Sequence, residues 1–261
     1  MNRNHNCVLK IAGLEFSYQS APVLKGVSLI IEEGDRFAIL GPNGTGKTTF
    51  LKCLNRKLKP KGSIMLEDRN LETFSRREIA RKIGFVPQES ETTSSFTGLE
   101  IILMGRYAHG GGFARTNEHD PGAIRDILRE TGTTDFAHRP FCRLSGGEKQ
   151  RIIIARALYQ NPGILLCDEP TLHLDLKSQV EILSLLKKSS QRGNLTILFA
   201  SHDINLAFQF AEKILLFSEG RIYAAGGREV LTENNLKTVF GIAPKMIEKD
   251  GATFFATLLT G

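Results

Sequence analysis

The chain has 261 residues, a formal net charge of +6 and four cysteines that form no C-x-x-C pair. No apolar run approaches the about 18 residues that a membrane-spanning helix needs, and the N-terminal residues lack the apolar stretch of a secretory signal peptide. We therefore expect a protein of the reduced cytosol, with one α/β core and a smaller attached subdomain. The basic residues are not interleaved with aromatic residues and form no nucleic-acid motif, so we expect no nucleic-acid partner.

In chain order, the first part of the chain is expected to be β-structure. Strands at 27–31 and 36–40 flank a turn at Glu33-Gly34, and we assign both strands to an antiparallel portion that ends at about Leu40. After Gly34, strands alternate with helices, which indicates a mainly parallel sheet. The sequence thus predicts an α/β fold with a mainly parallel sheet and an antiparallel β portion.

A helical subdomain is expected to interrupt the α/β core. Apolar residues recur at helical spacing over 97–107 and 121–131, and a shorter helix is expected over 75–82. We place the boundaries of the helical subdomain at 87–143, of the core at 1–86 and 144–241, and of a short irregular or β tail at 242–261.

The segment Gly41–Thr48 reads G-P-N-G-T-G-K-T and matches the phosphate-binding P-loop, G-x-x-x-x-G-K-[ST]. An apolar strand precedes it and helical spacing follows it, which is the order that a P-loop requires. Its glycines let the backbone wrap around phosphate oxygens, and the N-terminus of the following helix favours negative charge. Lys47 is expected to reach the β- and γ-phosphates, and the Thr48 hydroxyl to bind Mg²⁺. The alternative is a glycine-rich turn with a solvated lysine, which leaves the flanking strand and helix unexplained.

Two further strands end in polar residues that suit phosphate chemistry. The apolar run that starts at Ile164 ends in Asp168 and Glu169. An aspartate at this place in P-loop enzymes holds Mg²⁺, and Glu169 would polarise an attacking water. The run that ends at Ser201 is followed by His202, which could hydrogen-bond the γ-phosphate. The other histidines have no metal-ligand spacing, and we interpret them as surface or packing residues.

The segment Leu144–Glu148 reads L-S-G-G-E and precedes a helix-like run. A glycine pair behind a serine could present a second set of backbone amides to phosphate. The presence of two phosphate-binding segments, 41–48 and 144–148, is explained if ATP is held between two copies of the chain.

These segments together resemble the nucleotide-binding subunit of an ATP-binding cassette (ABC) transporter, from about Leu9 to about Gly241. The resemblance implies a P-loop NTPase core with an inserted helical subdomain, which hydrolyses ATP to ADP and phosphate with Mg²⁺. It implies a homodimer that holds two ATP molecules head to tail, with Lys47 of one copy facing Ser145 of the other. It also implies integral membrane permease subunits as partners, a substrate-binding protein that acts indirectly, and a peripheral place at the cytoplasmic face of the cell (inner) membrane.

The resemblance also assigns roles to single residues. Glu169 corresponds to the catalytic base, His202 to the switch histidine, and Tyr18 to the aromatic residue that stacks on adenine. The residues expected to contact the nucleotide are Tyr18, Gly41, Pro42, Asn43, Gly44, Thr45, Gly46, Lys47, Thr48, Thr49, Gln88, Ser145, Gly146, Gly147, Glu148 and Asp175. The residues expected to hold Mg²⁺ are Thr48, Gln88 and Asp168. The segment 144–148 corresponds to the signature motif, in which Glu148 stands where Gln is commonest. The segment 172–175 corresponds to the D-loop, in which Leu172 stands where Ser is frequent.

The subgroup rests on two shorter stretches. Residues 71–88 and the Met-Gly-Arg-Tyr stretch at 104–107 are similar to ATPases that import iron–siderophore, haem, cobalamin or molybdate. Manganese and zinc importers share the second stretch and stay an alternative. A rival of another class is a soluble cassette ATPase, such as an iron–sulfur assembly factor. We also expect residues 88–107 to dock a cytoplasmic helix of the permease, because this segment follows the expected phosphate sensor Gln88 and is rich in apolar residues.

Overall fold

The computed structural model describes residues 6–88, 95–109, 120–242, 244–249 and 252–257. The chain divides into two compact units. Unit 1 comprises Met1–Thr73 and Ile197–Gly261, and unit 2 is the continuous segment Phe74–Thr196. The boundaries predicted for the core, the helical subdomain and the tail are another way to divide the chain, and they stay a prediction.

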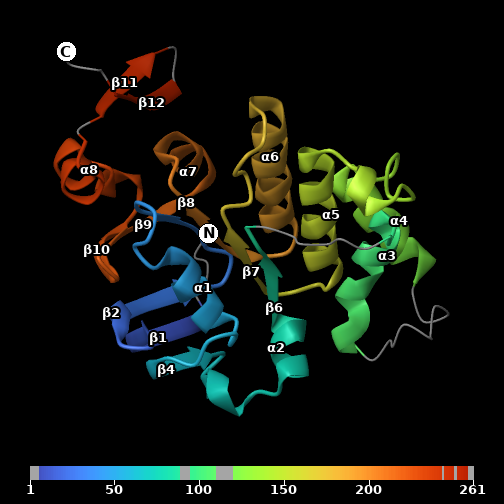
Figure 1. Cartoon of the computed structure of the whole chain (residues 1–261), viewed down its shortest axis with the longest axis horizontal. Helices are drawn as coiled ribbons and strands as arrows, with labels where there is room; N and C mark the ends of the chain where they lie inside the picture. Colours follow the sequence, from blue (N-terminus) through green and yellow to red (C-terminus); the bar gives the residue numbers. More distant parts are fainter. Residues whose placement is uncertain (1–5, 89–94, 110–119, 243, 250–251, 258–261) are drawn as a thin grey trace. The chain divides into compact units, whose positions relative to one another are not determined.

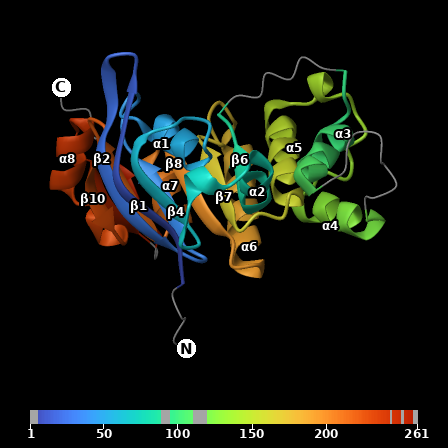
Figure 2. The same cartoon turned by 90° about the horizontal axis from the view of Figure 1, so that it is seen from below.

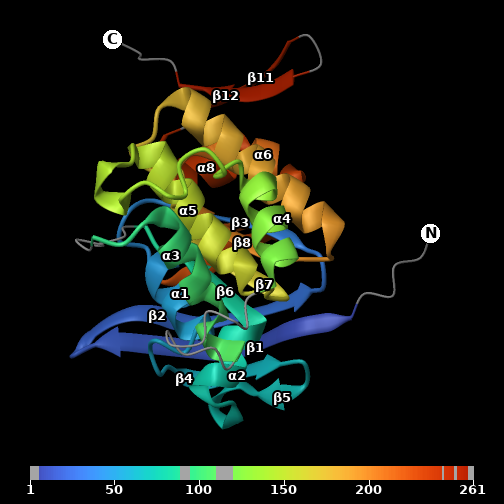
Figure 3. The ribbon, with the colours of Figure 1, turned by 90° about the vertical axis from the view of Figure 1, so that its right-hand side faces the viewer.

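Unit 1 contains an antiparallel sheet with the strand order β2-β1-β4-β5 (Figure 3). Its strands are β1 (Cys7–Tyr18), β2 (Ala21–Glu32), β4 (Lys61–Leu66) and β5 (Arg69–Asn70). Along β1, Leu9 and Ile11 are buried whereas Lys10 between them is exposed. This alternation is typical of a sheet with one face on the core and one face in water.

The second sheet of unit 1 is built around β3 (Arg36–Leu40). β3 pairs in parallel with β8 (Thr196–Ser201) and β9 (Lys213–Ser218), and β9 pairs antiparallel with β10 (Arg221–Gly226). The prediction that β3 belongs to the antiparallel portion with residues 27–31 is therefore wrong. The physical reason is burial, because four consecutive residues of β3 from Phe37 to Leu40 are buried, and a strand covered on both faces suits a parallel sheet.

The helices of unit 1 are α1 (Lys47–Leu54), α7 (Ile204–Phe210) and α8 (Glu233–Phe240), with short 3₁₀ turns at Leu71–Thr73 and Arg228–Val230. The tail forms an antiparallel hairpin of β11 (Lys245–Lys249) and β12 (Ala252–Ala256), which confirms a β tail. β12 packs on α7, and Figure 1 shows the hairpin beyond α7 and α8. The Asn205 side chain accepts from the Phe255 amide at 2.7 Å and donates to the Phe255 carbonyl at 3.1 Å.

Unit 2 has two parallel strands, β6 (Ile83–Val86) and β7 (Ile164–Asp168). Its helices are α2 (Arg76–Lys82), α3 (Gly98–Leu103), the 3₁₀ segment η2 (Met104–His109), α4 (Pro121–Thr131), the 3₁₀ turn η4 (Phe141–Arg143), α5 (Gly146–Tyr159) and α6 (Leu176–Arg192). α3 and α4 both pack against α5 (Figure 2). None of the helices in the described ranges combines the length and the apolarity that crossing a membrane requires.

Two helices of unit 2 show how local sequence sets their ends. α4 has the predicted bounds, since Asp120 caps its first turn through the Gly122 amide and Gly132 ends it at φ 62°. The helix expected over 97–107 begins after its cap Thr97 and continues as a 3₁₀ segment from Met104. A Cβ at Gly105 would lie 2.3 Å from the Arg156 carbonyl oxygen, so this stretch runs against the backbone of α5.

Candidate nucleotide-binding site

The P-loop connects β3 to α1 in unit 1. Gly44 and Gly46 have φ values of 81° and 103°, which side-chain-bearing residues rarely adopt, and Gly46 caps α1. A Cβ on Gly41 would lie 2.3 Å from the Phe217 carbonyl oxygen of the neighbouring strand. The glycines are therefore required by the path of the backbone, and they bring the loop to the N-terminus of α1, where an anion is favoured.

Lys47 lies over this loop and is buried. Its ammonium donates to the Gly41 carbonyl at 2.6 Å and to the Pro42 carbonyl at 3.0 Å, and the Thr45 hydroxyl also donates to Pro42 at 2.9 Å. The cation is thus held on carbonyl groups of the loop rather than extended into solvent. Thr48 and Thr49 follow in the first turn of the same helix. This arrangement of amides, glycines and one ammonium fits a polyphosphate.

His202 is brought to the same edge of the sheet as the P-loop. Leu40 at the end of β3 pairs in register with Ser201 at the end of β8, so Gly41 and His202 leave two adjacent parallel strands at their carboxyl ends. The turn after β8 is fixed, because the Asp203 amide donates to the Ser201 hydroxyl at 3.0 Å and the Asp203 side chain caps α7. Ligands of parallel α/β sheets bind at this edge.

Tyr18 lies at the end of β1 and is 46% exposed. Its ring meets the ring of Phe16 edge to face, with centroids 4.9 Å apart and an interplanar angle of 83°. Phe16 thus supports one edge of the tyrosine, which keeps the aromatic side chain available at the surface of unit 1.

In unit 2, Gln88 and the two carboxylates follow adjacent parallel strands. Val86 pairs in register with Cys167, so Asp168 and Glu169 leave β7 at the edge where Gln88 follows β6. Asp168 is 2% exposed and Glu169 is 9% exposed, whereas Gln88 is exposed. Two nearly buried carboxylates at a strand end are typical of a site with positively charged or hydrogen-bonding partners.

The backbone at Glu169 is unusual, since its φ is 46°. This left-handed conformation is uncommon for a residue with a side chain and often marks a functional constraint. The Leu172 amide donates to the Glu169 carbonyl at 3.1 Å, which turns the chain into the D-loop, 172–175. Asp175 then caps α6 by accepting from the Ser178 hydroxyl at 2.7 Å and amide at 3.0 Å, and these hydrogen bonds lower the pKa of Asp175.

The signature segment 144–148 forms the start of α5. Ser145 is the N-cap, and its hydroxyl accepts from the Glu148 amide at 3.3 Å. Glu148 returns the contact, because its carboxylate accepts from the Ser145 amide at 2.8 Å. This reciprocal pair is a capping box. The hydrogen bond from Ser145, with the Arg139 cation nearby, lowers the pKa of Glu148 from its ordinary value of 4.5.

The two glycines of the signature segment face the D-loop and α6. A Cβ on Gly147 would lie 2.6 Å from the Ser178 hydroxyl oxygen, and a Cβ on Gly146 would lie 3.4 Å from the Leu174 side chain. Gly147 therefore packs closely on Ser178, and the signature segment and the D-loop form one cluster in unit 2. Leu174, which lies in the D-loop, is thus the residue beside Gly146.

The structure thus assembles the predicted residues into two groups. Unit 1 brings together the P-loop and His202, and it carries Tyr18 at the end of β1. Unit 2 brings together Gln88, Asp168 and Glu169 at one strand edge, and the signature segment with Asp175 at another place. Sequence reasoning missed the capping box, although S-x-x-E before a helix is a readable pattern. It also missed Arg139, which lies just before the signature segment and belongs to no recognised motif, and the φ of Glu169, which no residue pattern indicates.

Comparison with known proteins gives the family. Residues 24–172 match the family described as ABC transporter. An uncharacterized ABC transporter ATP-binding protein of Methanocaldococcus jannaschii is 39% identical over 90% of this chain and 92% of that protein. The iron(3+)-hydroxamate import ATP-binding protein FhuC of Bacillus subtilis is 36% identical, and the ferric enterobactin transport ATP-binding protein FepC of Escherichia coli is 33% identical. Each of these two alignments covers 90% of this chain and 88% of the relative.

Solved structures agree with the sequence relatives. An inward-facing ABC transporter assigned to the metal-chelate type has a TM-score of 0.83 at 32% identity, and the match covers 97% of both chains. A dimeric ATP-binding cassette in a post-hydrolysis state, bound to ADP and Pi, has a TM-score of 0.74 at 31% identity, covering 84% of this chain and 98% of that one. The chain therefore belongs to the ABC transporter family, and it is an ABC transporter ATPase that binds ATP through its cassette.

Proposed function

We propose that the chain is the ATP-hydrolysing subunit that powers import of a metal chelate of the iron–siderophore, haem, cobalamin or molybdate type. One observation carries this proposal: the chain aligns over nearly its whole length with ATP-binding proteins named for iron(3+)-hydroxamate, petrobactin and enterobactin transport. The metal-chelate type transporter that matches 97% of both chains supports the same class. The exact chelate is set by other subunits, since this chain supplies force rather than substrate recognition.

In the proposed ATP site, unit 1 holds the nucleotide. The amides of the P-loop and the Lys47 ammonium surround the β- and γ-phosphates, because both lie at the N-terminus of α1. Thr45 keeps the loop in shape through its bond to Pro42. Tyr18 stacks on the adenine ring, and its exposed aromatic face suits this role.

The residues that would hold Mg²⁺ are Thr48, Gln88 and Asp168. They offer a hydroxyl, an amide oxygen and a carboxylate, which are the oxygen ligands that this ion prefers. Asp168 is 2% exposed, which fits a carboxylate whose charge is balanced by a nearby cation rather than by water. When bound, Mg²⁺ supplies positive charge that offsets the phosphate charge.

In the proposed hydrolysis step, Glu169 accepts a proton from the attacking water. The left-handed backbone at Glu169, with a φ of 46°, is the kind of constrained conformation that occurs at functional sites and supports this role. His202 hydrogen-bonds the γ-phosphate and keeps the water in line. Its position beside the P-loop, at the end of β8, supports this role.

The second half of each ATP site is proposed to come from another copy of the chain. α5 begins in the signature segment, which contains Ser145, Gly146, Gly147 and Glu148. The capping box uses the amides of Ser145 and Glu148, so the amides of Gly146 and Gly147 are the ones that suit a phosphate. Asp175 begins the next helix in the same cluster and would contact the dimer partner. The dimeric cassettes among the solved relatives support such an arrangement.

The permease is proposed to dock on the segment 88–107, of which 89–94 lies outside the described residues. Two of the apolar residues that suggested this surface, Ile101 and Ile102, are buried in unit 2 and belong to its core. Phe96 and Tyr107, in contrast, are 36% and 59% exposed, so both can contribute apolar contacts to a partner helix. A complex with a permease would place the chain at the cytoplasmic face of the membrane, with a substrate-binding protein acting from the other side.

The alternatives are a manganese or zinc importer ATPase, and a soluble cassette ATPase such as an iron–sulfur assembly factor. Affinity purification of the chain from solubilised membranes distinguishes the transporter from the soluble class, since only the transporter retains an integral membrane protein. Uptake assays with iron chelates, cobalamin, haem, molybdate, Mn²⁺ and Zn²⁺ then separate the importers. Chelate uptake that depends on the wild-type chain and stops with Glu169→Gln supports the proposal. Uptake of bare Mn²⁺ or Zn²⁺ alone, or purification without a membrane partner, contradicts it.

A further inference from the structure

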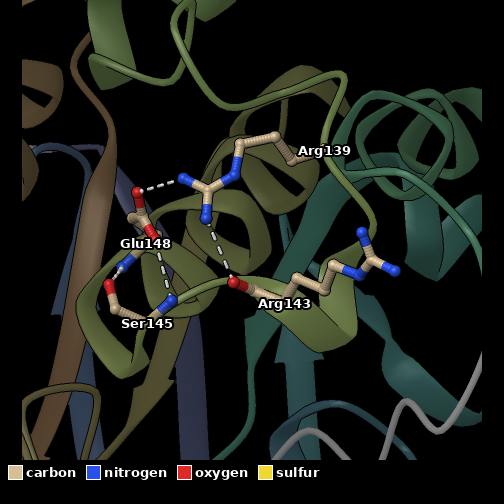
Figure 4. Close-up of polar contacts among 4 residues, drawn as sticks. All are labelled: Arg139, Arg143, Ser145 and Glu148. Atoms are coloured by element: carbon tan, nitrogen blue, oxygen red, sulfur yellow. Dashed lines mark hydrogen bonds and ion pairs between the residues drawn. The ribbon is translucent and has the colours of Figure 1, made fainter.

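The guanidinium of Arg139 joins two points of the chain around the signature segment. One nitrogen, Nη1, donates to the Glu148 carboxylate at 3.0 Å, and the other, Nη2, donates to the main-chain carbonyl of Arg143 at 3.1 Å. Figure 4 shows the planar group of Arg139 between these acceptors, with the Arg143 side chain pointing away from Glu148. The donors of a guanidinium are fixed in one plane. A single rigid group therefore connects the Arg143 carbonyl, which precedes α5, with Glu148 in the first turn of α5.

The negative charge of Glu148 has one favourable and one unfavourable effect at the start of α5, and the ion pair with Arg139 reduces the unfavourable one. A carboxylate in the first turn stabilises its own helix, because it lies at the positive end of the helix dipole. The same negative charge repels a polyphosphate that approaches this helix end. The Glu148 carboxylate also occupies the Ser145 amide. The amides of Gly146 and Gly147 have no acceptor within the helix, so they are the ones best placed for an anion.

We propose that Arg139 is a positioning residue for ATP binding between two copies of the chain: it orients the signature segment and neutralises Glu148 as the phosphates arrive. This inference rests on the proposed function, because it assumes that the signature segment meets ATP of a second copy. Arg139 acts through Glu148 and the loop backbone, and it needs no contact with the nucleotide itself. The ion pair is half-exposed, with side-chain exposures of 49% for Arg139 and 27% for Glu148, so solvent screens it and limits its strength.

The test measures dimer formation with ATP and Mg²⁺ by sedimentation velocity, in a full-length Glu169→Gln background that prevents turnover. Arg139→Ala is expected to raise the dimer dissociation constant about tenfold, since each dimer contains two screened ion pairs of this kind. ATP affinity of the dilute monomer is expected to stay within about twofold. Arg143→Ala is the matched control, because it removes the same charge from the same loop and keeps the carbonyl that Arg139 uses.

A rescue experiment separates positioning and charge from general structure. Adding Glu148→Gln to Arg139→Ala is expected to restore the dimer to within about threefold of the parent. Glutamine keeps an acceptor for the Ser145 amide and removes the charge that Arg139 offset. The defect of Arg139→Ala is also expected to shrink at 1 M salt, where the Debye length is about 3 Å.

Three results overturn the role of Arg139. They are normal dimerisation of Arg139→Ala, an equal loss of dimer in Arg143→Ala, and a loss in Arg139→Ala that Glu148→Gln leaves unchanged. If Arg139→Ala fails to fold, as judged by thermal unfolding, Arg139→Gln takes its place, since it keeps a donor for the Arg143 carbonyl and carries no charge. If the Glu169→Gln parent forms no ATP-dependent dimer, the proposed function itself fails, and the role of Arg139 fails with it.

Discussion

At the scale of single residues, the two carboxylates at the end of β7, Asp168 and Glu169, differ in what the sequence alone could predict about them. Their position at a strand end follows from the apolar run before them, and the structure places them next to the end of β6 as parallel strands require. The left-handed backbone of Glu169 could not be predicted, because it depends on the turn that Leu172 closes. The same is true of Lys47, whose fold-back onto Gly41 and Pro42 depends on the path of the loop.

The proposed role of Glu169 predicts a separation of binding from turnover. Glu169→Gln keeps the shape of the side chain and removes the base, so ATP hydrolysis is expected to fall about 10²- to 10⁴-fold while ATP binding persists. Phosphate release and equilibrium binding of a fluorescent ATP analogue measure the two quantities. Glu219→Gln is a matched control, because Glu219 is an exposed glutamate with a similar φ of 48°. Near-normal hydrolysis by Glu169→Gln would refute the role.

At the scale of elements, local patterns set the ends of helices but not the partners of strands. α4 has the bounds that its helical spacing predicted, and the structure shows Asp120 and Gly132 as its two caps, which are properties of neighbouring residues. β3 was expected at the right residues and given the wrong neighbours, since pairing is decided by burial over the whole sheet. The attachment of the tail to α7 through Asn205 could not be read from the sequence, because fifty positions separate the two partners.

The Asn205 contact predicts how firmly the C-terminal hairpin is held. Asn205→Ala removes both hydrogen bonds to Phe255 and leaves the Phe208–Phe255 ring contact in place. Each hydrogen bond contributes about 1 kcal/mol, so amide exchange in β11 and β12 is expected to accelerate about tenfold or more. Hydrogen exchange followed by mass spectrometry measures this, with Gln209→Ala on the same helix as the control. Unchanged exchange in the hairpin would show that the two bonds do not hold it.

At the scale of the whole molecule, one buried cysteine in each unit makes it possible to follow the unfolding of that unit. Cys53 lies buried in α1 of unit 1, and Cys167 lies buried in β7 of unit 2, whereas Cys142 is exposed. Burial raises the pKa of the Cys53 thiol to about 12 and raises the pKa of the Cys167 thiol further. Only the thiolate reacts with alkylating agents. Both buried thiols are therefore protected from alkylation by their burial and by their raised pKa.

Alkylation of the folded chain at pH 8 is therefore expected to modify Cys142 quickly, and Cys53 and Cys167 only when their unit opens. Mass spectrometry of peptides after increasing urea gives the order in which the two units unfold. Because a raised pKa keeps a thiol protonated until the pH nears that value, raising the pH from 7 to 9 should not accelerate the labelling of Cys53 or Cys167. Fast native labelling of Cys167 would contradict the buried position of the strand that carries Asp168.

In the proposed dimer, ATP is bound by one copy and enclosed by the signature segment of another. The most direct measurement compares Lys47→Ala and Ser145→Arg in the Glu169→Gln background, with ATP binding measured in dilute monomer and dimerisation by sedimentation. Lys47→Ala is expected to lose ATP binding and dimerisation together, since its cation meets the phosphates in the same copy. Ser145→Arg is expected to bind ATP as the parent does and to form no dimer. Equal loss of monomer ATP binding in both variants, or ATP-dependent dimers of Ser145→Arg, would contradict ATP binding between two copies of the chain.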